Sequence, residues 1–104
     1  MEKENTKVIV SPDDLESWLT TNPDRIYRRS LRASETIVNS PDIKENLLLE
    51  FEWEDSVYAK IYIKRSDIKP ALDKSINYFV TQELYEEAQK AKNILDKFLD
   101  NIKK

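Results

Sequence analysis

Four arginines within eight residues form the most basic stretch of this chain, and they are the first candidates for chemistry. Arg25, Arg28, Arg29 and Arg32 recur at spacings of three, four and seven, which places them on one face of a helix. Guanidinium groups can hold phosphates or an acidic partner through paired hydrogen bonds. Tyr27, in the same segment, could stack on a base. The stretch therefore predicts either a binding face or an ordinary solvated helix face.

A second charged stretch is acidic. Glu50, Glu52 and Glu54 alternate with apolar residues and are followed by Asp55. Alternate carboxylates on a strand lie roughly 6.5 to 7 Å apart, a spacing similar to that of phosphates along a nucleic-acid strand. The row could thus block a partner that handles nucleic acid. The other interpretation is a solvent-facing row that keeps the strand from aggregating.

Three absent residue types exclude most enzymatic chemistry. The chain has no histidine, no cysteine and no glycine. Thiol and histidine nucleophile systems, zinc fingers and disulfides are therefore excluded, as are glycine-rich phosphate loops. Asp13 and Asp14 follow Ser-Pro and are explained by the charge preference of a helix start rather than by magnesium binding. We expect no enzymatic activity, no metal site and no cofactor.

Composition indicates one folded domain over residues 1–104. Charged residues make up 36% and hydrophobic residues 39%, and the net charge is −3. This mild negative charge does not favour general binding to nucleic acid or to an anionic membrane. No apolar run is long enough to span a bilayer, and the polar first residues do not resemble a signal peptide. We expect a cytoplasmic location and no membrane partner.

The elements that must position the charged residues centre on a hairpin predicted over 46–65. Apolar and polar residues alternate on both sides of Asp55 and Ser56, as in two half-buried strands. The alternation predicts an inner face of Leu47, Leu49, Phe51, Trp53, Val57, Ala59, Ile61 and Ile63. A register that fits both faces pairs Trp53 with Val57, Glu52 with Tyr58, Phe51 with Ala59, Glu50 with Lys60 and Leu49 with Ile61. Turns that need positive φ must use Asn22, Asn39, Asn46 or Asp55.

Helices are predicted on both sides of this hairpin. A short strand at 7–10 is followed by helices that start near Pro12 and Pro23. Two more helices follow Ser66, with a break near Val80. The last carries an apolar seam with separations of 4, 3, 4, 3 and 4 residues, formed by Leu84, Ala88, Ala91, Leu95, Phe98 and Ile102. This wide seam predicts packing on the sheet or a neighbouring helix, or self-association as a homodimer.

Together these patterns predict an α+β fold: a small antiparallel sheet with the N-terminal helices and the two C-terminal helices packed on one face. Separate charged patches, five tyrosines and two tryptophans favour a non-enzymatic protein-binding regulator, such as a small adaptor, inhibitor or immunity-type protein. The alternative is a nucleic-acid-associated regulator that uses the arginine helix. The protein partner of the first hypothesis could itself be one that handles nucleic acid.

Overall fold

The computed structural model describes residues 6–102, and over this range the chain has an α+β fold, as predicted. The elements in chain order are β1 (Lys7–Ile9), α1 (Leu15–Thr21), α2 (Pro23–Asn39), β2 (Glu45–Trp53), β3 (Ser56–Lys64), α3 (Ile68–Thr81) and α4 (Tyr85–Ile102). Short 3-10 turns at Pro12–Asp14 and Arg65–Asp67 lead into α1 and α3. None of the helices in this range is long and apolar enough to cross a membrane.

The sheet is mixed rather than antiparallel, which corrects the prediction. Its strand order is β1-β2-β3, and β2 pairs antiparallel with β3 while β1 pairs parallel with β2. Val8 of β1 lies beside Phe51 of β2. The parallel pairing follows from the connection, because α1 and α2 carry the chain back across the sheet before β2 begins.

The middle of the hairpin has the predicted register, but its ends do not. Leu49 pairs with Ile61, and the two pairs beside it are also as predicted. The register then shifts between Phe51 and Glu52, so that Glu52 pairs with Val57 and Trp53 pairs with Ser56. The predicted pairs Trp53 with Val57 and Glu52 with Tyr58 are therefore wrong. A second shift lies between Leu47 and Leu49.

Each shift inserts one extra residue into a strand and gives the buried side another apolar group. Leu48 is the extra residue of β2, and it is buried beside Leu49. Tyr58 is the extra residue of β3, and it packs beside Ala59 in the small cluster around Phe51. Strict alternation could not predict either placement, because a bulge breaks the period of two.

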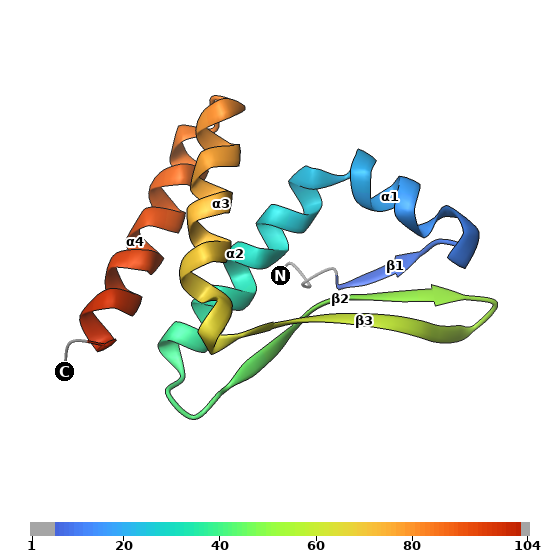
Figure 1. Cartoon of the computed structure of the whole chain (residues 1–104), viewed down its shortest axis with the longest axis horizontal. Helices are drawn as coiled ribbons and strands as arrows, with labels where there is room; N and C mark the ends of the chain where they lie inside the picture. The colour runs from blue at the N-terminus through green and yellow to red at the C-terminus, as the bar shows by residue number, and fades with distance from the viewer. Residues whose placement is uncertain (1–5, 103–104) are drawn as a thin grey trace, which may run out of the picture.

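Helices cover one face of the sheet (Figure 1). The α1 and α2 helices lie over this face, while α3 and α4 form an antiparallel pair on the other side of α2. The larger core cluster joins α2, α3 and α4 to the base of the hairpin and includes Ile37, Leu48, Ile63, Leu72, Phe79 and Ala91. The smaller cluster, Val8, Leu49 and Phe51, is packed against α1, and the Trp18 ring meets the Phe51 ring edge-on at 5.5 Å.

Glutamate and aspartate occupy the positive-φ turn positions of this glycine-free chain. Within residues 6–102, positive φ is found at Glu54 (51°), Asp55 (63°) and Glu83 (60°). The prediction is confirmed for Asp55 and wrong for the asparagines. Glu54 and Asp55 form the two-residue hairpin loop, whose geometry favours Asn-Gly.

The predicted break in the C-terminal helical region is confirmed. The α3 helix ends at Thr81, and the following residues close its end with two main-chain hydrogen bonds. The N–H of Glu83 donates to Val80 (3.0 Å) and that of Leu84 donates to Phe79 (2.7 Å). This is the helix-ending motif that usually carries glycine where Glu83 stands.

Candidate functional site

The arginines of α2 do not form one accessible binding face, because Arg29 belongs to the interior. Arg29 is only 5% exposed. Its Nε donates to the carbonyl of Leu48 and its Nη2 to the carbonyl of Leu47, each at 2.9 Å. Its predicted contact with a partner stays a prediction, but the structure places Arg29 inside the fold. The cause is the bulge in β2, whose carbonyl groups need donors that the strand ladder does not supply.

Arg25 connects α2 to the first strand. Its Nη2 donates to the carbonyl of Lys7 at 2.8 Å. Its guanidinium carbon lies 5.7 Å from the centre of the Trp18 ring, within the range of a cation–π contact. These contacts give Arg25 a role in packing α1, α2 and β1 together.

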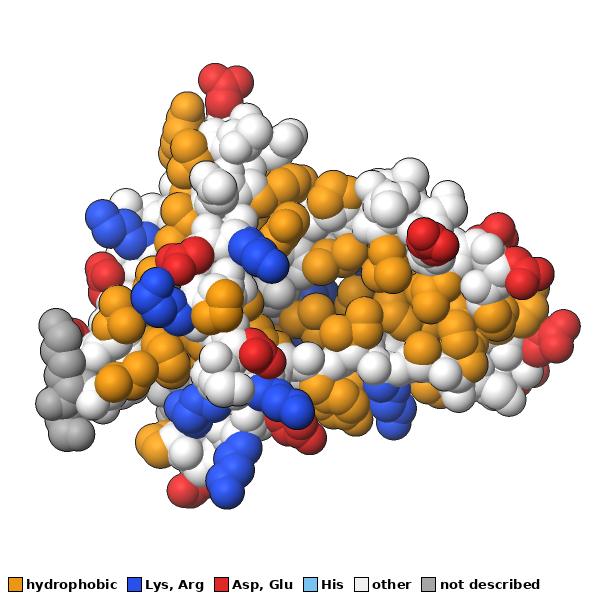
Figure 2. All heavy atoms as spheres, in the orientation of Figure 1, with side chains coloured by type: hydrophobic (Ala, Val, Ile, Leu, Met, Phe, Trp, Pro, Cys, Tyr) orange, Lys and Arg blue, Asp and Glu red, His pale blue; other side chains and the backbone are white. Residues whose placement is uncertain are grey.

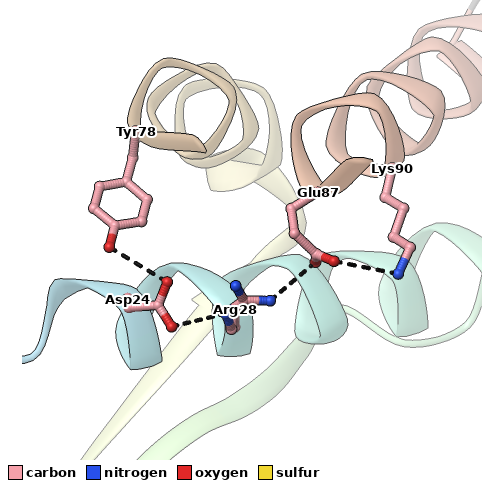
Figure 3. A network of polar contacts seen from close by, with 5 residues as sticks. All are labelled: Asp24, Arg28, Tyr78, Glu87 and Lys90. Atoms are coloured by element: carbon pink, nitrogen blue, oxygen red, sulfur yellow. Dashed lines mark hydrogen bonds and ion pairs between the residues drawn. The ribbon is translucent and has the colours of Figure 1, made fainter. Parts of the chain in front are cut away.

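Arg28 is the centre of a polar network that joins α2 to α3 and α4 (Figure 3). Its Nε donates to Asp24 at 2.7 Å, and its Nη1 lies 3.3 Å from Glu87. Lys90 lies 3.4 Å from the other carboxylate oxygen of Glu87. The hydrogen bond that Arg28 donates to Asp24 raises the pKa of Arg28 further above its already high value.

Tyr27 stacks on another tyrosine rather than standing free for a base. Its ring lies 4.6 Å from that of Tyr78, with an angle of 21° between the planes. The phenol of Tyr78 donates to Asp24 at 3.3 Å, and burial together with the charge of Asp24 raises the pKa of Tyr78. One face of Tyr27 is therefore already used within the fold.

The exposed Arg32 lies on a groove between α2 and α4 whose charges are mixed. The groove is lined by Arg28, Leu31, Arg32, Glu35, Glu87, Lys90 and Ile94. Two carboxylates thus lie among three basic side chains. Such a lining is a weaker site for a phosphate backbone than the uniform basic face that the spacing predicted.

The acidic row is interrupted by lysines and lies away from the arginine helix. The face of the sheet that α1 and α2 leave uncovered, here called the open face, carries Lys7, Ile9, Glu45, Leu47, Glu50, Glu52, Val57, Lys60, Tyr62 and Lys64. Glu52 lies 3.1 Å from the Lys7 ammonium and, as its hydrogen-bond partner, raises the pKa of Lys7. Glu54 and Asp55 form the turn beyond this face. The lysines reduce the resemblance to a row of phosphates.

The apolar seam of α4 is packed inside this chain. Ala88, Ala91, Leu95 and Phe98 are buried in the larger core cluster, and Leu84 packs against it. Ile102 alone among the seam residues is strongly exposed, at 62%. The seam therefore packs against α2 and α3, which leaves little of it exposed for the predicted self-association. The homodimer itself stays a prediction, without this surface to support it.

Trp53, predicted to be a core residue, is 42% exposed. It follows Phe51 on the helix-covered side of β2, close to the hairpin turn. Here the inner face of the hairpin continues beyond the helices. The exposure of Trp53 therefore shows that the helices cover only part of this face. Sequence periodicity predicts which residues share a face, but it does not predict how much of that face the helices cover.

A broad apolar patch surrounds this uncovered part. Hydrophobic side chains gather between α1 and the β-hairpin in Figure 2. We define the α1–β3 patch as the partly buried residues on this side, Leu15, Trp18, Leu19, Tyr58, Ala59 and Ile61, together with Trp53. The phenol of Tyr58 donates to the carbonyl of Val10 at 2.6 Å. This hydrogen bond fixes the orientation of the Tyr58 ring across the sheet, at the base of the patch.

The patch continues to an open sheet edge. Within residues 6–102, β3 pairs only with β2, so its other side has no neighbouring strand. Tyr62 and Val57 on this strand are 46% and 43% exposed. An aromatic patch beside a nine-residue edge strand is an arrangement that protein partners use.

The part of the chain that the structure describes contains no group of three or more acidic side chains able to hold a metal ion. Comparison with family models, curated proteins and solved structures finds no match.

Proposed function

We propose that this chain is a non-enzymatic protein-binding regulator that docks its partner on the α1–β3 patch. The observation that supports this proposal is the exposure of Trp53 at the end of a face that is otherwise core. A tryptophan at the edge of a preformed apolar surface is typical of the residues that dominate binding energy in protein interfaces. Regulation then follows from occupying a surface of the partner, as an adaptor or an inhibitor does.

The chemistry of the patch favours a protein over a nucleic acid. Its residues are aliphatic and aromatic, and they offer a phosphate backbone no row of cations. The arginines that supported the alternative are in part built into the fold, since Arg29 is buried and Arg25 and Arg28 hold neighbouring elements. Hydrophobic contact with a protein surface therefore explains more of the arrangement than binding to nucleic acid.

A capture experiment with matched variants tests this proposal. The wild-type chain, a Trp53→Ser variant and a Tyr85→Ser variant are immobilised and incubated with lysate of the source cells. Tyr85 is a suitable control because it is 62% exposed but lies on α4, outside the patch. We expect a protein that is retained by the wild type and the Tyr85 variant and lost from the Trp53 variant. Equal retention by all three would remove the α1–β3 patch as the docking surface.

A further inference from the structure

We infer that the partner supplies an extended segment that adds to β3 as a fourth strand, with acidic side chains alternating with apolar ones. This inference rests on the proposed function and names the form of its partner. Strand addition places the main chain of the segment at the free edge of β3 and every second side chain over the α1–β3 patch.

Hydrogen bonds to β1 establish which main-chain groups of the hairpin point outward. The N–H of Glu50 donates to the carbonyl of Thr6 at 2.8 Å, on the β1 side of β2. Successive residues of a strand direct their main-chain groups to opposite sides. Those of Leu49 therefore point to β3, and those of its partner Ile61 point back to β2.

The residues on either side of Ile61 are then the ones that can accept a new strand. By the same alternation, the N–H and C=O groups of Lys60 and Tyr62 point away from β2, toward the free edge. Both residues are exposed. They supply two donors and two acceptors with the spacing of a strand ladder.

The side chains of β3 specify the composition of the added strand. Lys60 and Lys64 are exposed on the open face, and within residues 6–102 neither ammonium has a carboxylate at ion-pair distance. In β2 the residues opposite them are Glu50 and Glu45. A strand on the other side of β3 that repeats this acidic pattern gains the same cross-strand attraction. Its alternate residues lie over Ala59 and Ile61 and are therefore apolar.

A second copy of β3 fits this edge less well. An antiparallel pair with its two-fold axis at Lys60 places Lys60 opposite Lys60, and an axis at Tyr62 places Lys60 opposite Lys64. An axis at Ile61 avoids these pairs but gives the lysines no acidic neighbour. The two lysines thus act against self-pairing while they favour an acidic segment.

The test uses two short synthetic peptides, one alternating glutamate with valine and one alternating lysine with valine, each with a fluorescent label. Binding to the full chain is measured by anisotropy. We expect the glutamate peptide to bind the wild type and the lysine peptide to bind at least roughly tenfold more weakly. Lys60→Glu should reverse this preference.

A matched pair of variants isolates the main-chain contact. Tyr62→Pro removes the outward N–H and keeps the ladder to β2, whereas Tyr62→Thr removes the same ring and keeps the N–H. We expect the proline variant to lose roughly tenfold or more in affinity relative to the threonine variant. Far-ultraviolet circular dichroism checks that both are folded. If the proline variant unfolds, slowed hydrogen exchange at the amides of Lys60 and Tyr62 on adding peptide tests the same contact in the wild type.

Several results overturn strand addition. These are the absence of binding by the glutamate peptide, equal binding by both peptides, equal binding by the two Tyr62 variants, unchanged exchange at the edge amides, or a dimer in sedimentation that Tyr62→Pro disrupts. The proposed function fails separately. A cellular partner that requires Trp53 but is retained equally by Tyr62→Pro and Tyr62→Thr supports the docking patch and rejects the added strand.

Discussion

Arg29 donates from Nε to the main-chain carbonyl of Leu48 at 2.9 Å, so a side chain of α2 closes the bulge of β2. The second bond, from Nη2 to the carbonyl of Leu47, completes a two-point attachment. Both carbonyls lie where the strand register shifts. The attachment therefore fixes both the position of α2 over the sheet and the side to which Leu48 turns.

Replacing this arginine should destabilise the fold. Arg29→Met keeps most of the apolar stem but leaves two carbonyl groups without these donors, at a loss of about 2 to 4 kcal/mol in the free energy of unfolding. Arg32→Met, at an exposed position of the same helix, should change it by only about 0.5 kcal/mol. Urea denaturation of the two variants measures the difference. Equal losses would contradict the role assigned to Arg29.

The arginine spacing correctly predicts a helical surface but cannot divide its residues between solvent and core. Arg29 has the same local pattern as Arg32, and only the bulge at Leu48 gives it buried partners. Likewise, alternation correctly predicts the centre of the hairpin, where Leu49 pairs with Ile61, because one buried face specifies the register there. It fails at Trp53, since coverage of that face depends on where α1 and α2 come to lie.

Glu83 offers a direct way to stabilise the chain. It has a positive φ (60°) in the turn between α3 and α4. At this φ the Cβ of any residue other than glycine adds backbone strain. Glu83→Gly should raise the free energy of unfolding by about 0.5 to 1 kcal/mol. Glu86→Gly, in the first turn of α4, should lower it by a similar amount, because that residue is helical. Thermal unfolding of both variants checks the opposite signs, and a loss of stability in the Glu83 variant would argue against strain at this turn.

Ser34 and Ser75 make a matched pair of fully buried hydroxyl groups. The Oγ of Ser75 donates to the carbonyl of Ala71 at 2.8 Å, whereas the Oγ of Ser34 has no hydrogen-bond partner within residues 6–102. A buried hydroxyl without a partner is destabilising. Ser34→Ala should therefore raise the free energy of unfolding by about 1 kcal/mol, while Ser75→Ala should leave it unchanged or lower it slightly. Chemical denaturation gives both values, and a destabilised Ser34 variant would contradict the expectation.

Stability at alkaline pH should depend on the bond from Tyr58 to Val10. Partial burial, and then the negative charge of Asp14, raise the pKa of Tyr58 above its usual value of 10.0. The folded chain thus holds this proton more tightly than the unfolded chain. The stabilisation is complete below the unfolded pKa and is lost as the pH rises through the folded pKa, so unfolding should become easier as the pH rises above 10.0.

Substitution of the phenol separates this effect from the titration of other groups. Tyr58→Phe keeps the ring in the α1–β3 patch but has neither the proton nor the bond to the Val10 carbonyl, so its midpoint of urea unfolding should fall less steeply over this pH range. Tyr85→Phe, at an exposed position of α4, serves as the control and should follow the wild type. If the Tyr58 variant loses stability with pH as steeply as the wild type, then deprotonation of this phenol is not what weakens the sheet. In that case packing alone, rather than the phenol hydrogen bond, holds the Tyr58 ring in the patch.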